Sequence, residues 1–262
     1  MVNIEKVGPV GAEITGIDLN ISEDISTSEI KEAFLNHSVL IFKNQQLDPA
    51  GLRNVSLIWG QPLIHPVFKG MKDYPEIIEI QNFGEKYHTN AHWHSDVTFE
   101  VEPPDATLLY SIEIPDEGGD TLFSNQYLAY EGLPTTLKKT LDNKFAIHSN
   151  LGVVILSGGD ASDAKEVYHP VFRTHPESGR KALYVTEAFV KEIIGLDSKA
   201  SQETLKTLYH HSSCRDYIYR HKWTAGDLVV WDNRCVLHYA EHGYGDKART
   251  MHRITTTGSK PL

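Results

Sequence analysis

Apolar and polar positions follow helical spacing in four parts of the chain. Two helix starts are predicted early in the chain, one at an S-x-x-E pattern that begins at Ser26 and one at Asp48-Pro49. Each is followed by apolar residues three or four positions apart. Two later helices are predicted over residues 127–143, with an interruption near Pro134, and over residues 201–211. These helices leave more than half of the chain to other structure.

The rest of the chain is patterned as short strands separated by turns. Residues 38–42 (SVLIF) predict a buried strand, and THPESGRKALYV predicts a hairpin. The segments DYIYRHKW, DLVVWD, CVLHYA and RTMHRITTT are rich in aromatic and β-branched residues, and the turn formers TAGD and WDNR divide them. Strands without regularly interleaved helices predict a mainly β fold with flanking helices, a sandwich or jelly roll. Without a repeat or a linker, we expect one domain over residues 1–262.

Composition excludes several classes of protein. Acidic residues outnumber basic ones by 35 to 25, so a general surface for nucleic acid is not expected. No apolar run has the length of a membrane span, and the first residues lack the order of a secretory signal, so we expect a cytoplasmic protein. Two cysteines without CxxC spacing indicate neither a disulfide scaffold nor a zinc knuckle. Fourteen histidines direct attention to metal chemistry instead.

The stretch HWHSD contains three side chains that could bind a metal. If it forms a strand, His92, His94 and Asp96 share one face. A single H-x-D pattern is weak evidence by itself. Two histidines and one carboxylate, however, form the facial triad of non-haem Fe(II) oxygenases. The third ligand would be a histidine on another strand, and His238 in WDNRCVLHYA fits best.

Two arginines near the C-terminus could bind an anion. Arg249 and Arg253 are four residues apart, so a strand through RTMHR would place both on one face. A guanidinium group offers a planar fork that matches carboxylate or sulfonate oxygens. The pattern favours a small anionic ligand bound by a few arginines.

Several motifs together resemble one enzyme family. WHSDVTF, GGDTLF, HPVFRTHPESGRKALYV, WDNRCVLHYA and RTMHR occur in the order seen in the TauD/TfdA family of Fe(II)- and 2-oxoglutarate-dependent dioxygenases, and GAEITGIDL and WGQPLIHPVF extend the similarity over nearly the whole chain. The resemblance implies a double-stranded β-helix, that is, a cupin-like jelly roll. It implies Fe(II) as metal, 2-oxoglutarate as cosubstrate and O2 as oxidant. The expected reaction hydroxylates a small anionic substrate, taurine or a related sulfonate or a carboxylate, while 2-oxoglutarate is decarboxylated to succinate.

The same resemblance assigns roles to individual residues. It makes His94, Asp96 and His238 the metal ligands and catalytic centre, whereas His92 is expected to line the pocket or support the ligands. Thr121 and Arg249 are expected to bind the distal carboxylate of 2-oxoglutarate.

The substrate side is carried over in the same way. Arg253, which we also count with the cosubstrate-binding residues, is expected to meet the anionic group of the substrate. His65 and Asn90 match further polar contacts. Phe68 departs from the pattern, because taurine-oxidising members have a tyrosine there; the missing hydroxyl argues against taurine itself.

Three alternatives remain open at this level. The substrate could be an aryloxyalkanoate or another carboxylate. A cupin enzyme could use His92 and His94 as an H-x-H pair, but Thr98 stands where such motifs place a glutamate. A jelly-roll binding module would explain the strands but not three ligands with two arginines. Residues 150–165 are expected to form a mobile lid or a plain surface loop, and the formation of a homo-oligomer stays open.

Overall fold

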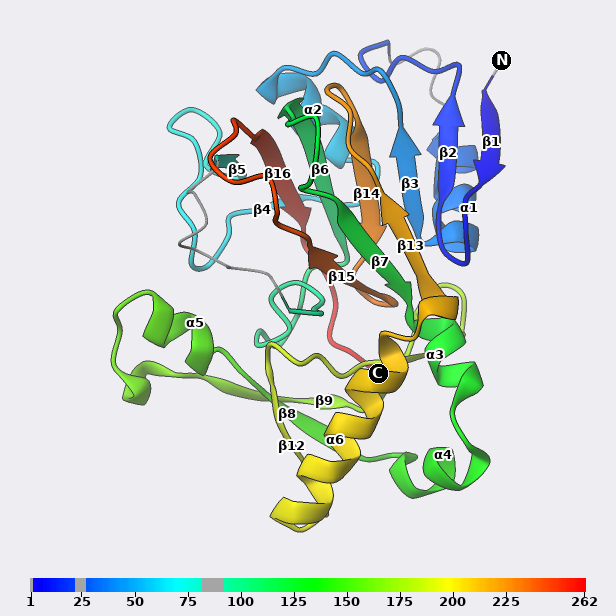
Figure 1. Ribbon diagram of the computed structural model, residues 1–262, viewed down its shortest axis with the longest axis vertical. Coiled ribbons are helices and arrows are strands. Elements are labelled where there is room, and N and C mark those ends of the chain that lie inside the picture. The colour runs from blue at the N-terminus through cyan, green and yellow to red at the C-terminus, as the bar shows by residue number, and fades with distance from the viewer. Residues whose placement is uncertain (1, 22–26, 82–91) are drawn as a thin grey trace.

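Two β-sheets pack face to face in the computed structural model, which describes residues 2–21, 27–81 and 92–262 (Figure 1). The larger sheet has the spatial order β1-β2-β3-β14-β6-β16-β4, and β5 also pairs with β16. Its strands are β1 (Asn3–Lys6), β2 (Ala12–Thr15), β3 (Val39–Phe42), β4 (Pro62–Leu63), β5 (Ile77–Gln81), β6 (Ala106–Glu113), β14 (Leu228–Asp232) and β16 (Thr250–Thr256). The smaller sheet has the order β13-β7-β15 and consists of β7 (Thr121–Asn125), β13 (Ile218–His221) and β15 (Val236–Ala240).

The two sheets enclose an apolar layer in the manner of a jelly roll. From β13 to β16, successive strands alternate between the two sheets, and every pairing within these sheets except that of β2 with β3 is antiparallel. Phe123 and Val236 of the smaller sheet pack with Val229 and Met251 of the larger one. The expected double-stranded β-helix is confirmed, because alternating side chains of both sheets fill the space between them.

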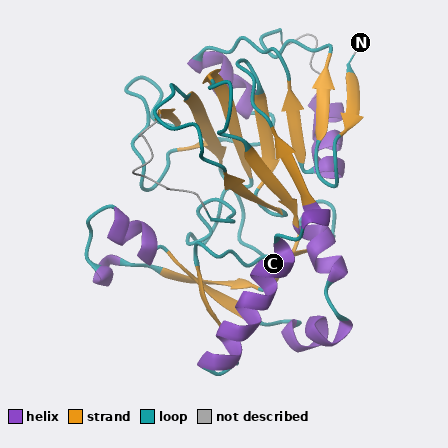
Figure 2. Ribbon diagram, viewed as in Figure 1, coloured by secondary structure: helices purple, strands orange, loops and turns teal. Residues whose placement is uncertain are grey.

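Helices cover the outer face of the larger sheet and the end of the sandwich (Figure 2). They are α1 (Thr27–His37), α2 (Pro49–Ser56), α3 (Gln126–Gly132), α4 (Thr135–Leu141), α5 (Leu151–Leu156) and α6 (Ser198–Ser212), with short 3-10 turns η2 (Ala161–Asp163) and η3 (Arg215–Tyr217). Phe34 of α1 and Leu52 of α2 pack against Phe42 and Leu108 of the larger sheet in a second apolar layer. Among the helices described, none combines the length and the apolar character that crossing a bilayer requires.

A smaller region adjoins one end of the sandwich, at the bottom of Figure 1. Its sheet has the order β12-β8-β9, and a hairpin of β10 and β11 lies next to it. The bounds are β8 (Phe145–Ser149), β9 (Glu166–Pro170), β10 (Phe172–Thr174), β11 (Lys181–Leu183) and β12 (Val190–Ile193). Leu205 and Leu208 of α6 pack on this region with Ala146 and Leu183.

Most element predictions are confirmed at the positions where a specific residue begins or ends a helix. Asp48 caps α2, since its side chain accepts a hydrogen bond from the Gly51 backbone N–H at 2.7 Å. Pro134 separates α3 from α4, as expected. Ser26, the predicted cap of α1, lies outside the described residues.

Of the two alternatives for residues 150–165, a mobile lid or a plain surface loop, the plain loop is wrong. The segment contains α5 and η2, and α5 projects at the left of Figure 1 with Ile155 and Leu156 exposed. Its Gly/Ser/Asp content does not prevent a helix, because those residues lie mostly after Leu156, while LGVVIL itself is apolar. Whether the segment moves as a lid stays a prediction.

Candidate metal centre and substrate cavity

The structure brings His94 and His238 into direct contact. Their main chains exchange two hydrogen bonds, from His94 N to His238 O at 3.0 Å and from His238 N to His94 O at 2.8 Å. This bridge places His94 at the free edge of β15, which is the edge strand of the smaller sheet. The two imidazole rings therefore lie side by side, with centroids 4.1 Å apart.

Asp96 completes the cluster. One ligand atom from each of His94, Asp96 and His238 lies within 4.8 Å of the others, and all three residues are buried. In the part of the chain that the structure describes, no other group of histidine, cysteine and carboxylate side chains has this spacing. HWHSD does not form the regular strand that was considered: His94 makes an isolated β-bridge, and the chain turns at Val97, which has φ 51°.

The donor set fits a divalent metal ion. Burial lowers the pKa of both His94 and His238, so the neutral imidazoles keep a lone pair for a metal. Burial alone would raise the pKa of Asp96, but Arg253, then His238 and His94, outweigh it and hold that pKa below its usual range. His94 Nδ1 lies 2.7 Å from the carbonyl oxygen of His92, to which it donates, and its Nε2 is left toward the cluster. Two nitrogens and one carboxylate oxygen are the facial set of non-haem Fe(II) sites.

His92 lines the same cavity as His94 and Asp96 but lies outside their cluster. Its side chain is exposed and lines the cavity beside the cluster, while its carbonyl oxygen orients His94. The expected pocket or supporting role agrees with this position, and the H-x-H alternative does not, because His92 is outside the group of three.

Arg253 lies at the border between the cluster and the cavity. Its Nη2 is 2.8 Å from Asp96 Oδ1, but Nε and Nη2 make no hydrogen bond of normal geometry among the described residues. Arg253 is 8% exposed and these donors are buried, so they can bind an incoming anion.

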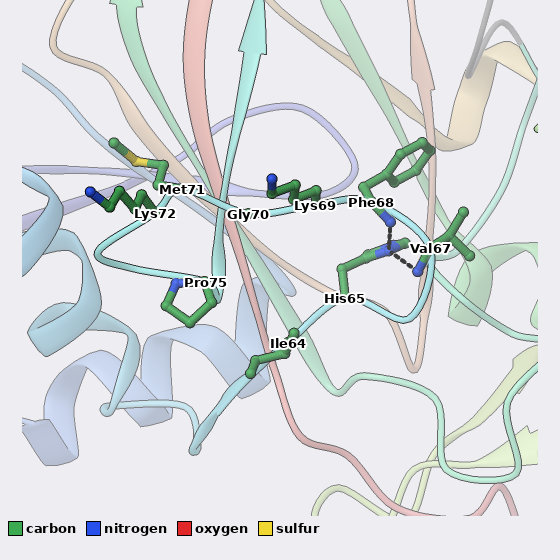
Figure 3. Close-up of a pocket in the computed structure, with 9 residues that line it drawn as sticks. All are labelled: Ile64, His65, Val67, Phe68, Lys69, Gly70, Met71, Lys72 and Pro75. Atoms are coloured by element: carbon green, nitrogen blue, oxygen red, sulfur yellow. Dashed lines mark hydrogen bonds between the residues drawn. The ribbon is translucent and has the colours of Figure 1, made fainter.

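His65 faces the same cavity from the loop that follows β4. Its Nδ1 accepts hydrogen bonds from the backbone N–H groups of Val67 and Phe68, at 3.1 and 3.0 Å, and Figure 3 shows both. Burial, with a smaller contribution from Arg253, lowers the pKa of His65 to about 4. The neutral ring therefore carries its proton on Nε2, which is a donor suited to an anion.

The cavity beside the cluster has a volume of about 500 Å³ and is mostly apolar. Val97, Phe99 and Phe189 line it, and so do Val153 and Leu156 of α5. Phe68 lines it as well and is 45% exposed, so the position that departs from the taurine pattern adds apolar surface. A second cavity, of about 730 Å³, lies along the loop from Ile64 to Pro75 and shares His65, Val67 and Phe68 with the first (Figure 3). Asn90, the remaining predicted substrate contact, lies outside the described residues.

Arg249 and Thr121 are not among the residues that line the cavity of about 500 Å³. Arg249 directly precedes β16, whose pairing with β5 is regular from Thr250 to Ile254, and the register shift in its pairing with β6 adds one residue to β6. That Arg249 and Arg253 share one face stays a prediction. Arg249 is buried: its Nη2 donates to the Gly119 carbonyl at 3.3 Å, and Nε has no hydrogen-bond partner in the described chain. Burial lowers the pKa of Arg249, yet a guanidinium keeps its charge in proteins.

Gly119 permits this close approach. It has φ 76°, and a Cβ there would lie 3.0 Å from Arg249 Nε. Thr121 begins β7 two residues later, and its Oγ1 accepts a hydrogen bond from Trp223 Nε1 at 2.9 Å. Because that N–H can only donate, the Thr121 hydroxyl proton is left for an acceptor such as a carboxylate.

Sequence reasoning missed several residues of this site. Trp223, Phe189 and the α5 residues Val153 and Leu156 come from turns or from a segment interpreted as a loop. The fully apolar run LGVVIL was the available signal for α5. Trp223 offered none, because its partner Thr121 is a hundred positions away.

Comparison with known proteins agrees with the fold and the cluster. The signature of the family described as "Taurine catabolism dioxygenase TauD, TfdA family" matches residues 3–255. An alpha-ketoglutarate-dependent sulfate ester dioxygenase of Pseudomonas putida is 34% identical, over 97% of this chain and 89% of its own. An alkylsulfatase of Acinetobacter baylyi is 35% identical, over 96% of this chain and 83% of its own. A crystal structure of a taurine dioxygenase from Burkholderia xenovorans superposes with a TM-score of 0.87 at 32% identity, over 100% of this chain and 91% of that chain.

The match over nearly the full length defines the class. The chain belongs to the TauD/TfdA family. It is a 2-oxoglutarate-dependent non-haem iron dioxygenase of jelly-roll fold that acts on anionic substrates, as the motif order predicted.

Proposed function

We propose that this enzyme oxidises a small organosulfur anion with an apolar tail, an alkyl sulfate ester or an alkyl sulfonate. The observation that carries the proposal is the composition of the cavity of about 500 Å³: buried cationic and N–H donors lie at the cluster, and apolar walls extend away from it. The names of the Pseudomonas putida and Acinetobacter baylyi relatives support a sulfate ester.

The anionic head group lies at Arg253 and His65 in this proposal. Arg253 offers buried guanidinium donors, and the neutral His65 offers an Nε2–H. A sulfate or sulfonate group accepts hydrogen bonds from both. With the head held there, the adjacent carbon lies toward His94 and Asp96, which line the same cavity.

The tail lies along the apolar wall. Phe68, Phe99, Phe189 and Leu156 offer aromatic and aliphatic surface, on which an alkyl tail packs better than a charged ammonium group. An alkyl chain gains free energy for each methylene that it buries, about 0.8 kcal/mol. The cavity therefore favours a substrate with an uncharged tail.

The cosubstrate and metal roles follow the same assignment. We propose His94, Asp96 and His238 as ligands of Fe(II), and Arg249 with the Thr121 hydroxyl as the site for the distal carboxylate of 2-oxoglutarate. When bound, the iron activates dioxygen for attack on an unreactive C–H bond. The chain itself positions the target carbon and excludes water through the phenylalanines of the cavity.

The overall reaction balances with the reagents of the family. One oxygen atom of O2 enters succinate as 2-oxoglutarate loses CO2, and the other enters the substrate carbon as a hydroxyl group. If that carbon bears a sulfate ester, the C–O bond to sulfate breaks as the hydroxyl loses its proton, and an aldehyde and sulfate result. A sulfonate gives an aldehyde and sulfite by breaking the C–S bond.

A substrate panel tests this proposal. Purified enzyme with Fe(II), ascorbate and 2-oxoglutarate is given linear alkyl sulfates of increasing length, the matching alkyl sulfonates, taurine and aryloxyacetates, and succinate is measured. We expect stimulation by an alkyl sulfate or sulfonate that increases with chain length. Equal or greater stimulation by taurine or by an aryloxyacetate would refute the apolar-tail organosulfur assignment.

We also propose that residues 1–262 act as one domain in the cytoplasm. Support for one domain comes from α3, whose Tyr127 packs in the apolar layer of the sandwich and whose Ala129 packs in that of the smaller region. Support for a reducing compartment comes from Cys214 and Cys235, both free thiols.

A further inference from the structure

Hydrogen bonds link three buried side chains in a row to one carboxylate oxygen of a fourth, Asp96. Trp231 Nε1 donates to Asn233 Oδ1 at 3.1 Å, and Asn233 Nδ2 donates to Thr107 Oγ1 at 2.8 Å. Thr107 Oγ1 then donates to Asp96 Oδ2 at 2.6 Å. None of these residues is more than 3% exposed, so water does not compete for the bonds.

The direction of every bond in this chain is fixed by chemistry. An indole N–H can only donate a hydrogen bond, and the same is true of a backbone N–H. The Asp96 backbone N–H donates to Asn233 Oδ1 as well, at 3.2 Å. The amide oxygen of Asn233 must therefore face these two donors, and its NH2 group must face Thr107. Since the Thr107 oxygen receives that N–H, its own proton goes to Asp96.

The larger sheet holds the chain in place. Thr107 is in the centre of the sheet, paired with Trp231 of β14 on one side and with Thr255 of β16 on the other. Asn233 follows β14 directly, and its backbone N–H donates to the Asp105 carbonyl at 2.9 Å. The Trp231 ring also contacts the His238 ring, with centroids 4.7 Å apart.

We infer that Thr107 and Asn233 are positioning residues, which hold Asp96 so that only Oδ1 is offered to the metal. Oδ1 is the oxygen that faces both histidines, 3.8 Å from His94 Nε2 and 3.5 Å from His238 Nε2. With Oδ2 occupied by the Thr107 hydroxyl, the carboxylate cannot turn to bind through both oxygens. One more coordination position of the metal then stays open for the other reactants. This inference rests on the proposed ligand set.

The test is metal affinity without 2-oxoglutarate or substrate, measured by calorimetric titration of the metal-free protein with Mn(II). Thr107→Val keeps the shape of the side chain and removes its proton donor, and we expect Mn(II) binding about 10- to 100-fold weaker. Thr107→Ser restores the hydroxyl and is expected to bind Mn(II) close to wild type. Thr255→Val is the matched control, because it removes a buried threonine hydroxyl from the neighbouring strand and outside this chain of bonds.

A structural effect is separated by unfolding the metal-free proteins. If Thr107→Val does not fold cooperatively, Asn233→Ala breaks the chain at a second point, and weaker Mn(II) binding is again expected. Wild-type Mn(II) affinity in the folded variant, or an equal loss in Thr255→Val, would overturn the positioning role. A wild-type protein that binds no Mn(II) would instead refute the metal site and this inference together, whereas a failed substrate panel with normal Mn(II) binding leaves it standing.

Discussion

His94 and His238 lie directly opposite each other and exchange both of their backbone hydrogen bonds, so the two imidazoles are fixed by main chain before any metal arrives. The pair joins an irregular segment to β15 of the smaller sheet. Preorganised ligands lose little conformational freedom on binding, which strengthens affinity.

Removal of either histidine of this pair is expected to abolish the metal site. His238→Ala leaves one imidazole and one carboxylate, and both calorimetric Mn(II) binding and succinate formation should fall below detection. His210→Ala, an exposed change on α6, is the control and should keep both. If His238→Ala binds Mn(II) with the affinity of the wild type, His238 is not a ligand.

Replacement of Arg249 is expected to weaken 2-oxoglutarate binding. A buried hydrogen bond to a charged group contributes about 1.5–3 kcal/mol, so Arg249→Ala should raise the KM for 2-oxoglutarate about 10- to 100-fold. Arg180→Ala removes an exposed arginine that pairs with Glu131 and should change nothing. Initial rates at varied 2-oxoglutarate measure the effect, and an unchanged KM in Arg249→Ala contradicts the assignment.

Trp223 is expected to act on 2-oxoglutarate through Thr121. Trp223→Phe removes the N–H that orients the Thr121 hydroxyl, so the KM for 2-oxoglutarate should rise while kcat changes little. In a Thr121→Val background the same change should have no further effect. Trp59→Phe is the control, since its Nε1 is buried without a hydrogen-bond partner in the described residues. Additive effects of the two changes would contradict the coupling.

Leu156 is expected to contribute to tail binding. Leu156→Ser removes apolar surface from the cavity wall, and the KM for an alkyl sulfate should rise about 3- to 10-fold. Ile155→Ser is a matched control, because Ile155 is the neighbouring exposed residue of α5 and does not line the cavity. The ratio of the KM values of the two variants, measured for alkyl sulfates of different chain length, gives the contribution of Leu156. Equal KM values for the two variants would show that α5 is not part of the substrate site.

His65 is expected to make stability depend on pH in a defined range. Its pKa is about 4 in the folded protein and 6.5 in the reference state, so the unfolded chain binds more protons between these values. The contribution of the neutral His65 to stability is complete above pH 6.5 and is lost as the pH falls toward 4.

Urea unfolding with a chelator from pH 7.5 to 4.5 measures this effect. Relative to His65→Gln, the wild type should lose free energy of unfolding as the pH falls through this range. Parallel pH profiles of the two proteins would show that the His65 ring is not buried in its neutral form.

The sequence by itself determined the local elements and the chemistry of the ligands. Caps and breakers such as Asp48 and Pro134 act within one turn of the chain, so α2 and the break between α3 and α4 could be predicted. The H-x-D pattern and His238 predicted the three residues that the structure brings together, and the order of the motifs predicted the family, because both predictions depend on residue identity and order.

Only the tertiary structure decided which polar atoms meet. The bridge between His94 and His238, the contact of Trp223 with Thr121 and the path from Trp231 to Asp96 all join residues from distant segments. No local pattern encodes such contacts, since they depend on strand register and on the turn at Val97, where strand alternation fails. Burial in the folded chain then lowers the pKa of His65 and leaves Arg253 donors without a hydrogen-bond partner among the described residues.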